Sequence, residues 1–526
     1  MTSQAMSAGA IVPAGDHVDR RRVVAFIAMV FGMFMAILDI QIVSASLAEI
    51  QAGLSAGADE VAWVQTSYLI AEVIMIPLSG TLAHILSTRV LYTISAAGFT
   101  IASILASTAT NIDQMIVYRT LQGFIGGAMI PSVFAAAYTI FPPSKRGVIT
   151  PVIGLIATLA PTIGPTVGGF ISDTMSWHWL FLVNVIPGVI VASSAWLLID
   201  FDEPDLGLAK RFDWWGLAGM AGFLGGLEYL LEEGPTRDWL SDPAVAFSAI
   251  LMASGALLFF ARAFMARYPI VELKAFRDVN FAFGSLFSFV LGMGLYGLVY
   301  LYPVYLARIR GYDAMMIGNT MFVSGLAMFL TAPIAGRLSM KLDPRMMLLA
   351  GFSLFAVGTW MMTRITADWD FNEILVPQIL RGVSLMLCMV PITNLALGTL
   401  PPDRLKNASG LFNVTRNLGG AVGLALINTA LINRSDMHYA RLAESVNWAN
   451  PAAVDQLAGM ARNFAASGID GVAAATRQMA GLVHREASVM AFSDVFFLLT
   501  VLFGVLALLA LVMRKPSPAA AAAPAH

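Results

Sequence analysis

The stretch Ala160-Pro161-Thr162-Ile163-Gly164-Pro165-Thr166-Val167-Gly168-Gly169 is the most specific feature of the chain. Gly164 and Gly168 have the GxxxG spacing that lets membrane helices approach closely, because neither residue carries a side chain. Pro161 and Pro165 each remove a backbone hydrogen bond and allow a helix to bend. GxxxG alone is common in membrane helices, whereas Gly-Pro-x-x-Gly-Gly after an upstream proline is much rarer. We therefore expect a bent, closely packed membrane helix at a moving interface.

The chain around this stretch is too apolar for a water-soluble protein. Of its 526 residues, 58% are hydrophobic and 12% are charged, and the mean hydropathy is +0.75. A soluble protein carries roughly twice that share of charged residues, because its exterior needs polar cover. A lipid bilayer removes this conflict. The composition predicts an all-α polytopic membrane protein.

About fourteen segments are apolar and long enough to cross a bilayer as a helix, which takes roughly 20 residues. They lie near 23–46, 61–84, 90–110, 114–140, 147–171, 178–199, 214–232, 244–264, 280–305, 315–338, 345–366, 374–399, 408–431 and 490–513. The pair 214–232 and 244–264 is the least secure, because its first member contains Glu228 and Glu232.

Basic residues indicate the orientation, because cytoplasmic loops of membrane proteins are rich in lysine and arginine. If the N-terminus is cytoplasmic, every lysine falls on the inner side, at 145, 210, 274, 341, 406 and 515. Both termini are then cytoplasmic, and the long polar segment 434–489 faces outward. Within it, Val454, Leu457, Met460 and Phe464 recur near helical spacing and predict a short amphipathic helix.

Ionisable residues inside predicted spans are costly and mark a functional site by default; six of them are the main candidates. They are Asp39, Glu72, Arg119, Glu228, Arg381 and Arg416. A carboxylate held away from water exchanges protons near neutral pH. Asp39 and Glu72 are therefore candidates to carry a proton or to pair with a cationic substrate. The alternatives are a structural ion pair or a water-facing position near the end of a span.

Other function classes lack the residues that they need. The single cysteine, Cys388, excludes a disulfide framework and a cysteine-based metal cluster, and no two histidines form an H-E-x-x-H pair. There is no Walker A sequence for ATP and no G-x-S-x-G for a hydrolase. The net charge of -2 gives no basic patch for nucleic acid. We expect no metal, no cofactor and no enzymatic activity.

The stretch 160–169 resembles the antiporter motif that exchangers of the major facilitator superfamily carry in their fifth helix, and it lies in the fifth predicted span. Arg119-Thr-Leu-Gln122-Gly123-Phe-Ile-Gly126-Gly127 resembles the fourth-helix motif of that family. The family arginine there is associated with proton coupling.

Further stretches resemble the fourteen-helix drug:proton antiporters of that superfamily (EmrB/QacA type). These are Leu38–Val43, Trp63–Leu69, Trp177–Pro187, Phe212–Gly216 and Arg416–Gly423. The resemblance covers about residues 23–513. It is greatest to EmrB-type permease subunits, because Asn433–His438 and Glu444–Asn447 of the outward segment also agree.

The resemblance implies the major facilitator fold, with two six-helix bundles and two extra helices. On that basis the chain divides into a cytoplasmic segment 1–22, an N-terminal bundle 23–199, a linker with the extra helices 200–264, a C-terminal bundle 265–513 that includes the periplasmic segment 434–489, and a disordered tail 514–526. Substrate would bind between the bundles near the membrane midplane, and the bundles would rock about it.

The implied activity is proton-driven efflux of small amphipathic or lipophilic compounds across the inner membrane. Asp39, Glu72, Arg119 and Glu228 are the candidates for proton coupling or substrate charge. EmrB-type permeases work with a periplasmic adaptor (membrane fusion) protein and an outer-membrane channel. Segment 434–489 is the candidate docking element for the adaptor, and its alternative is a mere connector.

The loop after the second span departs from the family pattern. In Gly80-Thr-Leu-Ala-His84-Ile-Leu-Ser87-Thr-Arg89, His84 stands where the family has an aspartate that helps to latch one conformation. In the second half of the chain, Gly336, Asp343 and Arg345 are candidates for a corresponding latch.

Met293, Tyr296 and Tyr300 are candidates to line an apolar, aromatic substrate cavity. Two other functions stay open: an importer or a narrow-specificity exporter of an endogenous metabolite, lipid or siderophore, and a membrane sensor that does not transport. The antiporter motif argues against import, and the acids Asp39 and Glu72 argue against a sensor.

Overall fold

The computed structural model describes residues 19–398, 400–466 and 470–512, and these residues form α-helices and short 3-10 turns with no strand. The helices before residue 200 are α1 (Arg20–Ala45), α2 (Leu47–Leu54), α3 (Ala58–Leu86), α4 (Thr88–Ser107), α5 (Ile112–Gly126), α6 (Met129–Ile140), α7 (Pro143–Thr174), α8 (Trp179–Leu182) and α9 (Val185–Leu198). Next come α10 (Trp214–Glu233) and α11 (Pro243–Met265). The rest are α12 (Val279–Arg308), α13 (Ala314–Ser339), α14 (Pro344–Met362), α15 (Phe371–Leu397), α16 (Pro402–Ser445), α17 (Pro451–Ala466) and α18 (Gly471–Val512).

Within the described part of the chain, 12 helical segments are long and apolar enough to cross a membrane. They account for every predicted span except 214–232 and 408–431. Those two spans are helical, in α10 and α16, but their residues are less apolar. Glycine, tryptophan and glutamate lower the hydropathy of α10, and asparagine, arginine and glycine lower that of α16.

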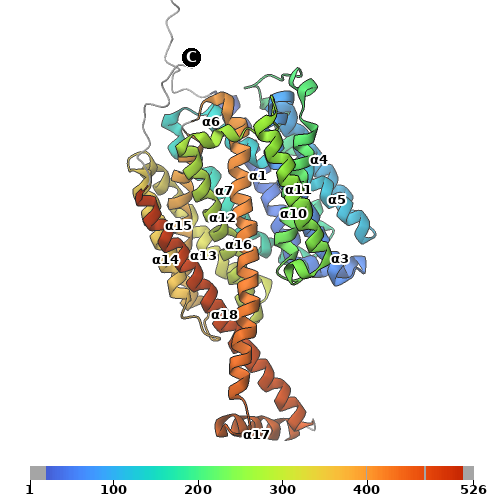
Figure 1. The fold of residues 1–526 in the computed structure, drawn as a ribbon, viewed down its shortest axis with the longest axis vertical. Helices are drawn as coiled ribbons and strands as arrows, with labels where there is room; N and C mark the ends of the chain where they lie inside the picture. The colour runs from blue at the N-terminus through green and yellow to red at the C-terminus, as the bar shows by residue number, and fades with distance from the viewer. Residues whose placement is uncertain (1–18, 399, 467–469, 513–526) are drawn as a thin grey trace, which may run out of the picture.

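The long helices pack in two groups that lie side by side (Figure 1). In the first group α1 packs against α7 and α9, and α5 packs against α3 and α4. In the second, α15 packs against α12, α13 and α14, and α18 packs against α14 and α16. The groups meet where α7 contacts α13 and where α3 and α6 contact α16. Helices α10 and α11 form a pair that lies against α3.

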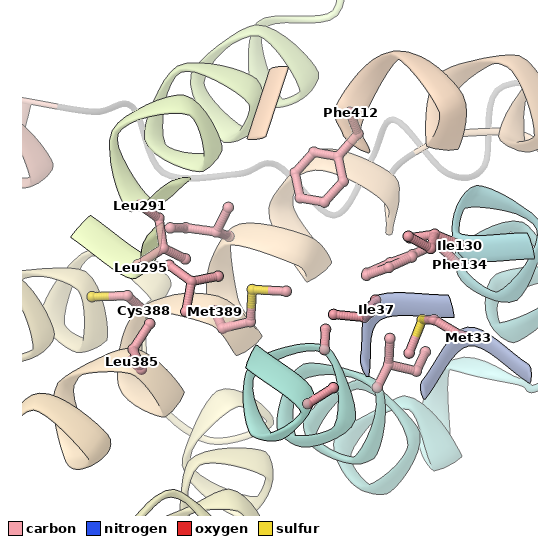
Figure 2. Close-up of a cluster of buried hydrophobic side chains, with 14 of the residues drawn as sticks. Met33, Ile37, Ile130, Phe134, Leu291, Leu295, Leu385, Cys388, Met389 and Phe412 are labelled. Carbon is pink, nitrogen blue, oxygen red and sulfur yellow. The ribbon is translucent and has the colours of Figure 1, made fainter. Parts of the chain in front are cut away.

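One apolar core runs through the contact between the two groups (Figure 2). Ile37 and Phe134 come from the first group, Met389 and Phe412 from the second, and all four are buried. The rings of Phe134 and Phe412 lie 6.2 Å apart between centroids. The two groups therefore share a close-packed interior at this level, which excludes water.

The segment 434–489 differs from its prediction as a polar connection with one short helix. Helix α16 continues to Ser445 and α18 begins at Gly471, so both project beyond the other helices and carry α17 at their end (Figure 1). Polarity was a poor guide to helix ends here, because a helix outside the membrane needs no apolar surface. The predicted amphipathic helix is α17, in which Val454, Leu457, Met460 and Phe464 are half-buried. The segments 1–18 and 513–526 lie outside the described residues.

Candidate functional site

A cavity of about 660 Å³ lies between the two groups of helices. Its wall includes residues of α1, α3, α7, α10, α12, α13 and α16. Tyr296 and Tyr300 line it, as predicted, whereas Met293 packs against the core instead. The Tyr300 hydroxyl donates to Asn428 Oδ1 at 2.6 Å, which orients the ring. The cavity therefore has one largely aromatic and aliphatic side.

Three carboxylates face this cavity, from Glu72 on α3 and from Glu228 and Glu232 on α10. Glu72 is 4% exposed, and its Oε1 atom has no hydrogen-bond partner. Among the described residues, no hydrogen bond or ion pair holds any of the three carboxylates. Glu232 was not a predicted site residue, although its i,i+4 spacing from Glu228 places both on one face of the helix.

Asp39 lies in a different place from Glu72, inside a dry network of the first group. Arg119 Nη1 donates to Asp39 Oδ2 at 2.6 Å, and both side chains are fully buried. The Gln122 amide donates to Asp39 Oδ1 at 3.2 Å, and the Asn184 amide donates to the same oxygen at 2.6 Å. The carboxylate thus has three partners, from α5 and from the turn between α8 and α9. Asn184 was missed as a site residue, although it stands in the stretch Trp177–Pro187.

Further contacts hold the arginine of this network through Nε, Nη1 and the face of its guanidinium, while Nη2 has no hydrogen-bond partner among the described residues. Arg119 Nε donates to the Val64 carbonyl oxygen at 3.1 Å, and Nη1 also donates to Gln122 at 2.7 Å. Its guanidinium lies 4.2 Å from the centroid of the Tyr68 ring. Gly123, in the next turn of α5, lies against the Tyr68 backbone, where a side chain would collide. The network therefore fixes α1, α3 and α5 relative to one another.

The stretch 160–169 lies in the second half of α7, where it packs closely against α1. A Cβ atom on Gly168 would lie 2.6 Å from the Ile42 carbonyl oxygen, so only glycine fits without backbone movement. Gly164 lies against Gln41, and Gly169 and Pro161 are buried. Pro165 lines the cavity. The stretch therefore joins the cavity to the helix that carries Asp39.

The second group holds two buried arginines without carboxylate partners. Arg381 Nη1 donates to Gln378 Oε1 at 3.2 Å, but Nε and Nη2 have no partner in the described structure. Its guanidinium lies 5.7 Å from the centroid of the Tyr302 ring. Arg416 donates to Asn413 and lies 5.1 Å from the centroid of the Phe134 ring, which belongs to the first group.

At the end of the molecule where α3 finishes, the two groups are in direct contact. A Cβ on Gly80 would lie 2.8 Å from Asn407 Cα of α16, so the two backbones approach closely. Gly336 of α13 approaches the Gly147 backbone of α7 in the same way. Arg89 lies 4.5 Å from the centroid of the Trp196 ring. Asp343 caps α14, and its Oδ1 atom lies 3.9 Å from Arg345 Nε.

An ion pair that the sequence did not predict joins the groups at this end. Lys406 Nζ on α16 donates to Asp202 Oδ2 at 2.6 Å and to the Ala83 carbonyl oxygen at 3.1 Å. Asp202 Oδ2 also accepts from Thr88, at 2.7 Å from the backbone nitrogen and 2.6 Å from Oγ1. We call this cluster of Ala83, Thr88, Asp202 and Lys406 the end clamp. It sits beside His84, where the family aspartate is missing.

Two groups of membrane helices around a shared cavity are an arrangement typical of a membrane transporter. The sequence profile of the Major Facilitator Superfamily matches residues 29–424, and the chain belongs to this superfamily. Within the superfamily its relatives are EmrB-type proteins. It is 42% identical to the colistin resistance protein EmrB of Acinetobacter baumannii, over 93% of this chain and 96% of that one. It is 31% identical to the multidrug export protein EmrB of Escherichia coli, over 82% of this chain and 84% of that one.

Solved structures agree with this assignment at the level of the fold. The human organic anion transporter MFSD10 superposes with a TM-score of 0.59 at 12% identity, over 92% of this chain and 100% of that one. The protein is therefore a multi-pass membrane protein with the major facilitator fold.

Proposed function

We propose that this protein exports small amphipathic or lipophilic compounds across the inner membrane in exchange for protons. The observation that carries the proposal is a cavity between the helix groups that presents a buried, unpartnered carboxylate, Glu72, beside an aromatic wall. The names of the relatives support transport out of the cell, because one is a multidrug export protein and another is a colistin resistance protein.

In this proposal Glu72 exchanges protons with water and substrate through the cavity. Protonation of Glu72 from the outside weakens its hold on substrate, and release of the proton inside resets the site. A membrane potential drives each proton with about 2.3 kcal/mol per 100 mV. The change in charge at Glu72 alters the ion pair of Asp39 and Arg119. Because this pair joins α1 and α5, the two helices move in response. The contact of α7 with α1 at Gly168 is the surface along which the groups move.

The domain organisation in this proposal keeps the predicted boundaries, with fourteen spans and both termini cytoplasmic. Helices α10 and α16 supply the two spans that are less apolar than the others. Their packing supports this, since α10 lies against α11 and α3, and α16 lies between α12 and α18. All of these neighbours are apolar enough to cross a membrane.

The end clamp acts in this proposal as the cytoplasmic gate. Its lysine and aspartate come from the two halves of the chain, and the cavity lies toward the other end of the same helices. Asp202 thereby takes the place of the family aspartate that is missing at His84. The structure then corresponds to the state in which the cavity faces outward.

The projecting ends of α16 and α18, together with α17, form the docking element for a periplasmic adaptor protein, which in turn joins an outer-membrane channel. This places the chain as the permease subunit of a tripartite efflux system. The exposed side chains at the tip support the proposal, since Trp448 is 82% and Val472 is 63% exposed. Exposed aromatic and aliphatic residues in water are typical of a contact surface.

Everted membrane vesicles that contain the protein test the proposed exchange. The vesicles are energised by respiration, and internal pH is followed while lipophilic cations, acids and neutral compounds are added. Proton release that depends on the compound and vanishes in Glu72→Gln and Asp39→Asn supports the proposal. Correctly inserted protein that gives no proton response to any compound would overturn it. Glu203→Gln, at an exposed carboxylate outside the cavity, is the matched control.

A further inference from the structure

The inserted helix α10 forms part of the cavity wall, where it supplies two of the three carboxylates. Glu228 and Glu232 lie one turn apart, which is about 6 Å along a helix axis. A Cβ on Gly225 would lie 3.3 Å from Ile70 Cγ2 and 3.6 Å from Ile74 Cδ1 of α3. This contact packs α10 against α3, and Glu72 of α3 lines the same cavity as Glu228 and Glu232 of α10.

The charge of the cavity wall is not balanced by the protein itself. Three carboxylates face the cavity, and Arg308, an exposed residue, is the one lysine or arginine among its described lining residues. In addition, the side-chain oxygen of Gln65 faces the cavity, is buried and has no hydrogen-bond partner. Buried carboxylates of this kind either bind a proton or pair with a donor or a cation, which offsets the loss of water.

We propose that Glu72, Glu228 and Glu232 form a site for a compound with two cationic nitrogen groups on an aromatic or aliphatic body. One cation pairs with Glu72 of α3, next to the Gln65 oxygen, and the other pairs with the two acids of α10. Tyr296 and Tyr300 contact the apolar body and offer ring faces to a quaternary nitrogen. The inserted helix pair thus determines specificity. This inference rests on the proposed export function for its physiological meaning.

Equilibrium binding to the purified full-length protein in lipid nanodiscs tests the site. The probes are a bis-quaternary ammonium compound with an aromatic ring at each end, and its analogue of equal length in which one nitrogen is replaced by carbon. We expect wild type to prefer the dication by about tenfold or more, as for one additional charge pair. The double variant Glu228→Gln/Glu232→Gln should lose this preference and bind the monocation within about twofold of wild type.

Two further variants separate charge from fold. Glu228→Asp/Glu232→Asp keeps both charges and should keep a preference for the dication, whereas Glu203→Gln should bind both probes as wild type does. If the double glutamine variant does not fold, Glu232→Gln alone replaces it, with an expected loss of preference of about threefold. Equal binding of the two probes to wild type, or an unchanged preference in the glutamine variant, overturns the inference.

Binding is measured without a gradient, so its outcome is independent of the transport assay. If the protein prefers the dication but exchanges no protons, the proposed function is overturned and this inference stands. If the protein exchanges protons for monocations and neutral compounds but shows no preference for the dication, this inference is overturned and the proposed function stands.

Discussion

The two halves of the molecule bury an arginine in similar surroundings but satisfy it in opposite ways. In α5, Arg119 has a glutamine three residues later and lies over Tyr68; in α15, Arg381 has a glutamine three residues earlier and lies over Tyr302. Only the first arginine has a carboxylate, Asp39, at 2.6 Å. Arg381 Nη1 instead donates to the sulfur of Met321 on α13, at 3.9 Å.

This difference indicates a division of labour between the halves. A buried ion pair holds its helices in one arrangement, whereas a buried charge without a charged partner costs free energy. The first half therefore carries the responsive charge network, next to the cavity acids. The second half holds its arginine at an energetic cost that can be measured.

The largest effect is expected when the first network loses its cation. Arg119→Gln leaves Asp39 buried and without its ion-pair partner, which should lower the free energy of unfolding by about 3–5 kcal/mol. Exchange of protons in vesicles should be lost. Thermal unfolding in detergent and the vesicle assay check both parts. The double variant Asp39→Asn/Arg119→Gln removes both charges and should be more stable than Arg119→Gln alone. Equal stability of the two variants would show that the unpaired charge of Asp39 is not the main cause of the loss in stability.

The comparison sharpens if the second half is given the carboxylate that it lacks. Met321→Glu places an acid beside Arg381 and Gln378, whose amide nitrogen lies 3.3 Å from the Met321 sulfur. A double-mutant cycle of Met321→Glu with Arg381→Gln should give a coupling free energy of about 2 kcal/mol, as for a charged hydrogen bond. Met321→Gln is the control of equal shape. A coupling energy near zero would show that the two sites are not comparable.

Removal of the second arginine should have a smaller effect, of opposite sign to that of Arg119→Gln. Two of the guanidinium nitrogens of Arg381 have no partner, and a buried unsatisfied donor costs about 1–3 kcal/mol. Arg381→Gln should therefore raise the free energy of unfolding by about 1 kcal/mol. The measurement is thermal unfolding of Arg381→Gln, compared with that of wild type and of Arg119→Gln. If Arg381→Gln destabilises the protein as much as Arg119→Gln does, the contrast between the halves is wrong.

The sequence predicted the charged residues of these sites better than their arrangement. Asp39, Glu72 and Arg119 stand out because a charge within an apolar segment is visible without a structure. The pairing of Asp39 with Arg119, which leaves Glu72 without a partner, depends on how α1, α3 and α5 pack, which no local pattern records. Glu232 was noted only as a charge that made span 214–232 less secure, and its place on the cavity wall depends on how α10 packs against α3.

The end clamp and the segment 434–489 were missed for other physical reasons. Asp202 and Lys406 are ordinary surface residue types, about 200 positions apart, and only the contact of the two halves brings them together. In segment 434–489 the polar composition predicted a connection with one short helix, yet polar residues also extend α16 and α18 as helices. The pattern of apolar residues alone therefore determines neither the long-range contacts nor the helices that lie in water.

The end clamp joins the two halves, and its loss should have the smallest of these effects. We expect it to change the equilibrium between the closed and open states of this end rather than the free energy of unfolding. Lys406→Met removes an ion pair that is mostly shielded from water, with exposed fractions of 14% for Lys406 and 12% for Asp202. We expect the state with this end open to become about fivefold more populated, which corresponds to about 1 kcal/mol. A cysteine introduced by Ser79→Cys, at a buried position of α3 near the clamp, should then react about fivefold faster with a maleimide in detergent.

The chain suits this measurement because its own cysteine, Cys388, is fully buried and gives little background reaction. Asp202→Asn should accelerate the reaction by a similar factor, and the double variant Asp202→Asn/Lys406→Met should add little, because both changes remove one interaction. Lys341→Met, at an exposed lysine on the same side of the second half, should leave the rate unchanged. An unchanged rate in Lys406→Met, or fully additive effects of the two clamp variants, would mean that Asp202 does not replace the missing family aspartate. Non-additive acceleration would instead place the gate at Asp202, a residue outside the loop in which the family carries it.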